Sequence, residues 1–168
     1  LKSLLRLSGL KYEILETTAA GEATEIARDL AKRKQDRIIV LGGDGTISEV
    51  VNGILGTTVE LGMICVGTGN DIARSLGIPH NNLKASLEVI LAGRTKMVDI
   101  GTETDRSFVS ALGIGLAANI AAKANTMKTL KGPVAFFVAA YQAIASLESF
   151  PLCLKLDSRK MEVECVAV

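Results

Sequence analysis

The sequence has few of the residues that build metal centres, disulfide scaffolds or thiol–imidazole catalysts. Its 168 residues include one histidine, three cysteines, three prolines and no tryptophan. The cysteines fall in no metal-ligand spacing, and His80 has no cysteine nearby, which argues against zinc ligation and Cys–His catalysis. Each cysteine lies in an apolar run, so we expect buried thiols in a reducing compartment, the cytoplasm: Cys65, Cys153 and Cys165.

The chain also lacks a large net charge, a visible signal peptide and a long hydrophobic run. The formal net charge is +1, so no overall field attracts nucleic acid, and we expect no nucleic-acid partner. The most apolar stretch, GPVAFFVAAYQAIASL, is short for a membrane span and fits a buried or lipid-facing helix better. With 48% hydrophobic and 22% charged residues, the chain is globular and forms one domain or slightly more.

The first half alternates between strand and helix patterns. Apolar residues recur at helical spacing over 21–34, and RIIVLGG and ELGMICVG are short continuous apolar runs typical of strands covered on both faces. Further predicted elements are a strand at 12–15, preceded by the tail of a helix, and helices at 48–55, 70–77 and 82–93. This order predicts an α/β domain over residues 1–96, with a Rossmann-like, largely parallel sheet.

The pattern changes after Gly93. Two strands around a polar turn are predicted at 95–115, then helices at 116–125 and 133–147, then a β-hairpin from 151 to 168 in which apolar and polar residues alternate. Residues 97–168 are therefore predicted to begin an antiparallel, β-rich (β-sandwich) domain with inserted helices. The aromatic residues of the second helix are expected to pack on this domain, with an acyl-chain groove as the alternative: Phe136, Phe137 and Tyr141. We expect the chain to be truncated at both ends.

The sequence GGDGT at 42–46 stands between a predicted strand and a predicted helix. It is therefore expected to form a loop at the carboxyl edge of the sheet, where ligands of α/β proteins bind. Glycines there let phosphate oxygens approach backbone N–H groups, and a helix N-terminus, with Thr46 or Ser48 as its cap, adds partial positive charge. The carboxylate of Asp44 fits such a site if Mg²⁺ lies between it and the phosphates. A simple turn without a ligand explains this loop equally well.

A second loop of the same kind follows the next predicted strand. The stretch VGTGNDIARSLGIP places two glycines around a threonine at 67–69, and then Asn70 and Asp71 at the start of a helix. Two adjacent loops of a parallel sheet face the same crevice. A pair of glycine-rich loops that each carry one aspartate favours a phosphate and metal site over two unrelated turns.

Together, GGDGTISEVVNGIL and GTGNDIARSLGIP resemble the diacylglycerol kinase catalytic family, in its bacterial lipid-kinase branch, which is related to sphingosine kinases and NAD kinases. The segments ETTAAGEATEIA, VDIG, FVSALGIGL and LKGPVAFFVAAYQAIASL follow the order of this family, so the resemblance covers essentially the whole chain. The GGDGT element is shared with NAD kinases, whereas GTGND followed by AR and GIP is specific to the lipid kinases. Ser48 and Ala117 depart from the family, which often has asparagine and aspartate there.

This resemblance implies an ATP- and Mg²⁺-dependent kinase that transfers the γ-phosphoryl group of ATP to a hydroxyl of a diacylglycerol-like lipid at the membrane surface. Asp44 and Asp71 are expected to organise the metal through water. The expected nucleotide-binding residues, with one or both of the first two threonines in contact, are Thr17, Thr18, Gly42, Gly43, Asp44, Gly45, Thr46, Ser48, Glu49, Gly67, Thr68, Gly69 and Asn70.

The resemblance places the general base beyond Val168 and a further nucleotide loop before Leu1. The chain by itself is therefore expected to be weakly active or inactive. Two alternatives stay open: a kinase for a soluble hydroxyl substrate such as NAD, and a non-catalytic nucleotide-binding or regulatory module. Whether the protein forms a homo-oligomer also stays open.

Overall fold

The computed structural model describes residues 11–103, 106–127, 133–156 and 158–168. It divides into two compact units, Leu1–Ser110 and Ala111–Val168, called here the N-terminal and C-terminal units. The N-terminal unit includes a short hairpin that the sequence pattern groups with the second predicted domain. The helix predicted before Gly9 lies outside the described residues.

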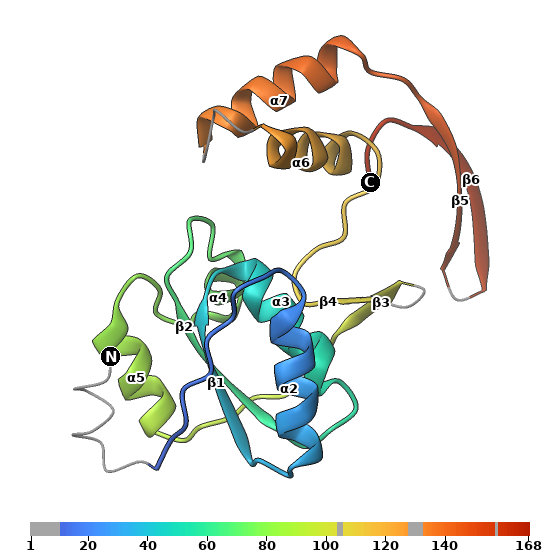
Figure 1. Cartoon of the computed structure of the whole chain (residues 1–168). Helices are drawn as coiled ribbons and strands as arrows, with labels where there is room; N and C mark the ends of the chain where they lie inside the picture. The colour runs from blue at the N-terminus through green and yellow to red at the C-terminus, as the bar shows by residue number, and fades with distance from the viewer. Residues whose placement is uncertain (1–10, 104–105, 128–132, 157) are drawn as a thin grey trace. The chain divides into compact units, whose positions relative to one another are not determined.

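The N-terminal unit is an α/β fold, as predicted (Figure 1). Strands β1 and β2 pair in parallel from Arg37↔Glu60 to Gly42↔Cys65, and helix α3 lies between them in the sequence. The elements are α2 (Glu22–Lys32), β1 (Arg37–Gly42), α3 (Asp44–Ile54), β2 (Glu60–Cys65), α4 (Asp71–Leu76), α5 (Leu83–Leu91), β3 (Gly101–Glu103) and β4 (Arg106–Phe108).

Helices cover both faces of this sheet, which explains the continuous apolar runs of its strands. Ile38 and Val40 of β1 and Met63 of β2 belong to a buried cluster with residues of α2, α3 and α4. The other face meets α5, because a Cβ atom built on Gly62 would lie 3.3 Å from Ile90 Cγ1. Figure 1 shows α2 and α3 on one side of the strands and α5 on the other.

Two predictions for this unit were wrong in detail. Residues 12–15 are not a strand; Tyr12 and Leu15 are 40% and 46% exposed, and no described strand pairs with them. Helix α3 begins at Asp44, four positions before the predicted start, because the loop turns directly into the helix after Gly43. The predicted C-terminus of α5 is confirmed, since Gly93 adopts a left-handed conformation with φ 66°.

The β3–β4 hairpin pairs antiparallel, as predicted, and is attached to α3. Asn52 of α3 donates from Nδ2 to the Ser107 carbonyl (2.9 Å), and the Ser107 N–H donates to Asn52 Oδ1 (3.0 Å). The side-chain amide of Asn52 thereby acts as an extra strand residue beside β4. Ser107 is 9% exposed, so these bonds satisfy backbone groups that water does not readily reach.

The C-terminal unit contains α6 (Leu116–Thr126), α7 (Pro133–Ala145), β5 (Phe150–Leu156) and β6 (Arg159–Cys165). The small residues Ala135, Ala139 and Ala143 are buried at helical spacing on α7, which packs against α6. No described helix has the length and apolar character needed to cross a membrane.

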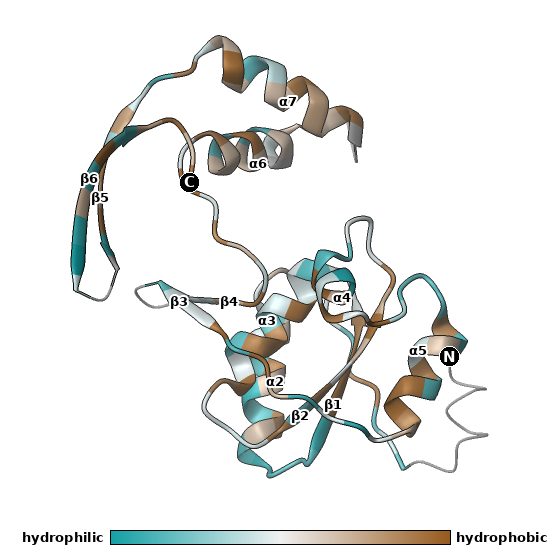
Figure 2. Ribbon diagram, turned by 180° about the vertical axis from the view of Figure 1, so that it is seen from behind, coloured by the Kyte–Doolittle hydropathy of each residue, from teal (hydrophilic) through white to brown (hydrophobic). Residues whose placement is uncertain are grey.

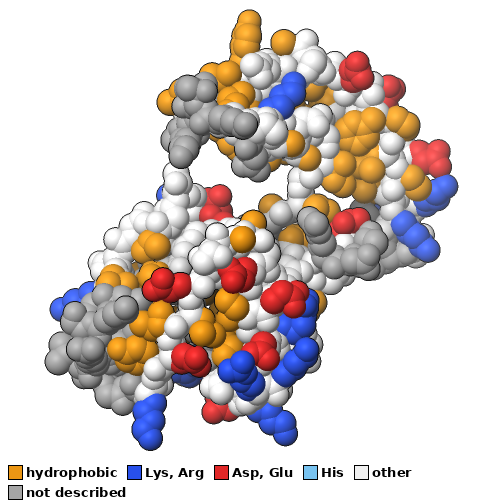
Figure 3. Space-filling view, viewed as in Figure 1, with side chains coloured by type: hydrophobic (Ala, Val, Ile, Leu, Met, Phe, Trp, Pro, Cys, Tyr) orange, Lys and Arg blue, Asp and Glu red, His pale blue; other side chains and the backbone are white. Residues whose placement is uncertain are grey.

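The aromatic residues of α7 do not pack in the way the sequence predicted. Phe136, Phe137 and Tyr141 are 53%, 76% and 77% exposed, because the alanine side of the helix takes the contact with α6. Much of α7 is coloured as hydrophobic in Figure 2, and hydrophobic side chains reach the surface of both units in Figure 3.

Strands β5 and β6 form the predicted antiparallel hairpin, in which Leu152 pairs with Val163 and Leu154 with Met161. Cys153 points to the opposite face of this hairpin and is exposed, so the prediction that it is buried was wrong. Cys65 is buried as predicted, and Cys165 is partly buried. Within the described residues the antiparallel sheets are two-stranded, and a β-sandwich stays a prediction.

Candidate functional site

The first glycine loop leads from β1 into α3. Gly43 is the residue before the helix, in an extended conformation with φ −101° and ψ −173°. The first bond within the helix runs from the Ile47 N–H to the Gly43 carbonyl (3.1 Å), so the N–H groups of Asp44, Gly45 and Thr46 have no partner within the helix. Such N–H groups at a helix start are suited to bind an anion.

The predicted helix cap was wrong. No side chain caps the start of α3, and Thr46 and Ser48 both lie inside the helix. Thr46 instead folds back on the loop: a Cβ atom built on Gly42 would lie 2.9 Å from Thr46 Oγ1. The start of α3 thus keeps its free N–H groups without competition from a capping hydroxyl.

The second glycine loop is closed by Asn70, which is fully buried and has φ 53°. Its Oδ1 accepts from the Gly67 N–H (2.9 Å), and its Nδ2 donates to the Gly67 carbonyl (2.7 Å) and to Asn81 Oδ1 (3.4 Å). Asparagine is among the residues that tolerate this left-handed backbone. The side chain of Asn70 is therefore used to shape the loop, and Thr68 is left exposed on it.

The two loops touch each other through their glycines. A Cβ atom built on Gly67 would lie 2.6 Å from the Cα of Gly43, and one built on Gly43 would lie 3.2 Å from the Cα of Gly67. A side chain at Gly67 would therefore separate the loops. This close approach is a reason for glycine that the sequence pattern alone does not reveal.

The aspartates of the two loops converge beside this contact. Asp44 Oδ1 accepts from the Ile72 N–H (3.0 Å) at the start of α4. A Cβ atom built on Gly69 would lie 3.0 Å from Asp44 Oδ2 and 3.3 Å from Asp71 Oδ2, so both carboxylates border the same small space. The sequence prediction that the two aspartates face one crevice agrees with this arrangement.

This donor set fits a hydrated Mg²⁺ better than a fully protein-bound ion. The described residues contain no cluster of three or more His, Cys, Asp or Glu side chains that would hold a metal. Mg²⁺ often keeps waters and takes one or two carboxylates together with substrate phosphates. Asp44 and Asp71 supply that number of carboxylates next to the free N–H groups of α3.

Cys65 lies at the end of β2, directly before the second loop, and is fully buried. Burial raises the pKa of its thiol, and the negative charge of Asp44 raises it further. The thiol is therefore protonated at neutral pH and is not a nucleophile of the site. Its carbonyl accepts from the Asn81 N–H (2.8 Å), which ties residues 80–81 to the loop.

Three other predicted residues lie outside the two loops. Thr17 and Thr18 are exposed in the segment before α2. Glu49 lies on α3 with its carboxylate on the start of α2, bonded to the Gly21 N–H (2.9 Å) and the Ala23 N–H (3.3 Å). Sequence reasoning missed this link, because a bond between residues on two helices leaves no local pattern.

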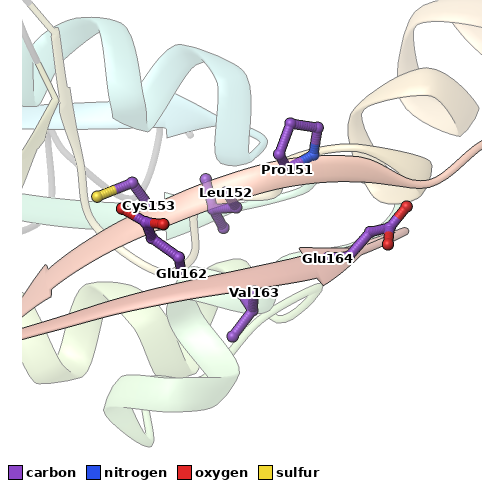
Figure 4. Close-up of a pocket in the computed structure, with 6 residues that line it drawn as sticks. All are labelled: Pro151, Leu152, Cys153, Glu162, Val163 and Glu164. Atoms are coloured by element: carbon purple, nitrogen blue, oxygen red, sulfur yellow. The ribbon is translucent and has the colours of Figure 1, made fainter.

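A hollow of about 480 Å³ on the described residues contains none of the predicted site residues (Figure 4). Its lining comes only from the β5–β6 hairpin: Pro151, Leu152, Cys153, Glu162, Val163 and Glu164. The polar groups there come from strands rather than from loops at a parallel sheet edge. We therefore place the candidate site at the glycine loops.

The fold and the paired loops define an α/β protein with two glycine-rich loops at one edge of a parallel sheet. Similarity to known proteins narrows the class. Residues 1–102 match the diacylglycerol kinase catalytic domain. The chain is 35% identical over 160 residues to the diacylglycerol kinase of Bacillus subtilis, covering 94% of this chain and 53% of that protein. It is 31% identical over 169 residues to the diacylglycerol kinase of Staphylococcus aureus strain JH9, covering 98% of this chain and 53% of that protein.

A crystal structure of a diacylglycerol kinase from Bacillus anthracis str. Sterne matches with a TM-score of 0.75 and 31% identity, covering 97% of this chain and 53% of that one. The chain belongs to the diacylglycerol kinase catalytic domain family. It spans about half the length of the curated relatives it matches.

Proposed function

We propose that the chain is the nucleotide-binding part of an ATP-dependent lipid kinase that transfers the γ-phosphoryl group to a hydroxyl of a diacylglycerol-like lipid. The observation that carries this proposal is the convergence of Asp44 and Asp71 beside the Gly43–Gly67 contact. Family membership and the names of the relatives support the acceptor class.

Each part of the site has a proposed task. The N–H groups at the start of α3 would bind phosphate oxygens, and the glycines would let those oxygens come close to the backbone. Asp44 and Asp71 would hold Mg²⁺ through water, and the ion when bound would neutralise phosphate charge. Thr68 and the Thr17–Thr18 segment would contact the nucleotide, whereas the side chain of Asn70 would keep the second loop in shape.

Phosphoryl transfer depends mainly on positioning and charge neutralisation, which these residues are suited to provide. We assign the general base to no residue of this chain. Residues 97–168 are proposed to contribute to the lipid-binding domain, and the protein is proposed to work from the cytoplasm at the membrane surface.

The test is an assay with radiolabelled ATP, Mg²⁺, NAD and vesicles that contain defined lipid alcohols, analysed by thin-layer chromatography. The protein should be the complete product of the gene that contains this chain, with its Asp44→Asn variant as the matched control. Labelled phosphatidic acid from the wild type and not from the variant supports the proposal. Label found only in phosphorylated NAD, or no transfer at all, would overturn it.

A further inference from the structure

The carboxylate of Glu49 lies at the start of α2, not at the start of its own helix. Oε1 accepts from the Gly21 N–H (2.9 Å) and Oε2 from the Ala23 N–H (3.3 Å). The backbone adds a third link, because Thr24 Oγ1 donates to the Glu49 carbonyl (3.0 Å). Both oxygens of this side chain are therefore engaged with α2.

Helix α2 depends on an outside group for these bonds. Its first residue is preceded by Gly21, which has φ 87° and no side chain to cap the helix. The first N–H groups of a helix need partners, and a carboxylate there is also favoured by the helix dipole. Glu49 supplies the partner and the charge at once.

The segment just before α2 carries the two threonines predicted to contact the nucleotide. Thr18 donates to Glu22 Oε2 from its N–H (2.6 Å) and its hydroxyl (3.2 Å), and the Ala19 N–H donates to the same oxygen (3.3 Å). Residues 18–23 are thus fixed by two carboxylates, Glu22 from within α2 and Glu49 from α3. The threonines themselves are exposed, so no packing holds them in place.

We propose that Glu49 is a positioning residue of the nucleotide site. It fixes the position of the Thr17–Thr18 segment relative to the first glycine loop. The loop leads directly into α3 at Asp44, and Glu49 lies on this same helix. Its carboxylate acts through α2 and does not contact the nucleotide. This inference rests on the proposed function, in which the threonine segment and the loops bind one nucleotide.

The experiment is a double-mutant cycle, read as ATP affinity by titration calorimetry and as KM and kcat. It combines Glu49→Ala with the paired change Thr17→Ala/Thr18→Ala in the complete protein. Glu49→Ala alone should weaken ATP binding about fivefold, the effect of losing a helix cap, and should raise KM for ATP with little change in kcat. In the threonine-free background the same change should have almost no further effect, because the segment it positions no longer contributes contacts.

Three further variants and measurements keep the inference open to refutation. Glu49→Gln keeps an acceptor oxygen and should retain most of the affinity for ATP. This variant also replaces Glu49→Ala in the experiment if the alanine variant does not fold. Glu25→Gln removes the Glu25 carboxylate, which lies in the first turn of α2 and bonds to Arg28. This change should leave ATP binding unchanged. In the nucleotide-free protein, Glu49→Ala should accelerate hydrogen exchange at the Gly21 and Ala23 amides.

The outcomes separate the two proposals. Equal losses from Glu49→Ala in both backgrounds would mean direct contact with the nucleotide and would overturn the inference. An affinity unchanged by Glu49→Ala or by the threonine changes would overturn it as well, while ATP binding that still needs Asp44 would leave the proposed function standing. If the wild type binds no ATP, the proposed function fails, and the positioning role falls with it.

Discussion

Gly43 and Gly67 lie in backbone contact, although they belong to different strand-to-helix loops. The contact brings the two loops together at one edge of the parallel sheet, and the carboxylates of Asp44 and Asp71 border the space beside it. Because neither glycine has a Cβ atom, the main chains can approach more closely than other residues allow. The geometry of the site therefore depends on the lack of a side chain at Gly43 and Gly67 as well as on the carboxylates.

Gly67→Ala should separate the loops. The added Cβ atom would lie 2.6 Å from the Gly43 Cα and 3.1 Å from Asn70 Oδ1, so backbone must move. We expect a loss of about 1–3 kcal/mol in the free energy of unfolding, the usual cost of overpacking, measured by urea unfolding. Gly45→Ala is the matched control: it meets no atom within 4 Å and lies in a helix, so it should not destabilise the fold. Equal stability of the two variants would contradict the prediction.

Asp44 has a structural bond and a proposed charge role, and two substitutions separate them. Asp44→Asn keeps an oxygen that can accept from the Ile72 N–H, so its stability should stay close to that of the wild type. Asp44→Ala should cost about 1 kcal/mol more, as does the loss of a helix cap. Both should lower lipid phosphorylation on the order of a hundredfold or more if the carboxylate supports the metal. Activity of Asp44→Asn within a few-fold of the wild type would remove the metal role.

Gly53 allows α2 and α3 to pack closely. A Cβ atom there would lie 2.5 Å from the Thr24 carbonyl oxygen and 2.7 Å from Ala27 Cβ. Alanine favours a helix over glycine by about 1 kcal/mol, yet the clash with backbone should outweigh that gain. We predict that Gly53→Ala lowers the melting temperature, measured by circular dichroism. A rise would show that the two helices can move apart freely.

The Cys65 thiol should make stability depend on pH in the alkaline range. Burial, and then the charge of Asp44, raise its pKa in the folded protein, whereas the unfolded thiol ionises near its ordinary value of about 8.5. The protonated Cys65 thiol therefore contributes its full share to the free energy of unfolding below about pH 8.5. That share is lost as pH rises further, because the thiol ionises more readily in the unfolded chain than in the folded protein. The free energies of unfolding of the wild type and of Cys65→Ala should be measured with urea between pH 7 and 10. The difference between the two proteins should narrow or reverse at high pH. Parallel profiles would contradict this.

In the C-terminal unit, Gly115 also stands where an added Cβ atom would collide with its neighbours, as at Gly67. It has φ 77°, and an added Cβ atom would lie 2.5 Å from both Phe150 Cε1 and the Val166 carbonyl oxygen. Gly115→Ala should break the backbone bonds that join residues 114–116 to 166–168, with faster hydrogen exchange at the Leu116 amide. Gly113→Ala, whose Cβ atom would meet only Ala117 Cβ at 3.1 Å and an amide at 3.9 Å, is the control and should exchange at nearly the wild-type rate. Similar exchange in both variants would contradict the prediction.

Local patterns in the sequence were sufficient for much of the fold. The apolar runs predicted β1 and β2, and the alternation after residue 150 predicted the β5–β6 hairpin, although not its register. Periodicity reports which face of an element is buried, so it works wherever burial is one-sided or complete. It failed at 12–15, where the apolar residues of a strand-like segment have no described strand beside them.

The candidate site was predictable in outline only. Glycine and aspartate positions indicated two loops at one sheet edge, which is a property of parallel topology. The bonds of Glu49 to α2 and the burial of Asn70 depend on side chains from elements that meet only in three dimensions. No spacing along the chain encodes such meetings.

Cys65 is fully buried before the second loop, whereas Cys153 is exposed on the hairpin. The reactivities of these two thiols can therefore be compared to follow local opening of the protein. A thiol-alkylating reagent should modify Cys153 at once and reach Cys65 only when the strand end beside the loop opens. The delay between the two modifications would time that opening without any added label. Slower modification of Cys65 in the presence of ATP would then report occupancy of the neighbouring loop.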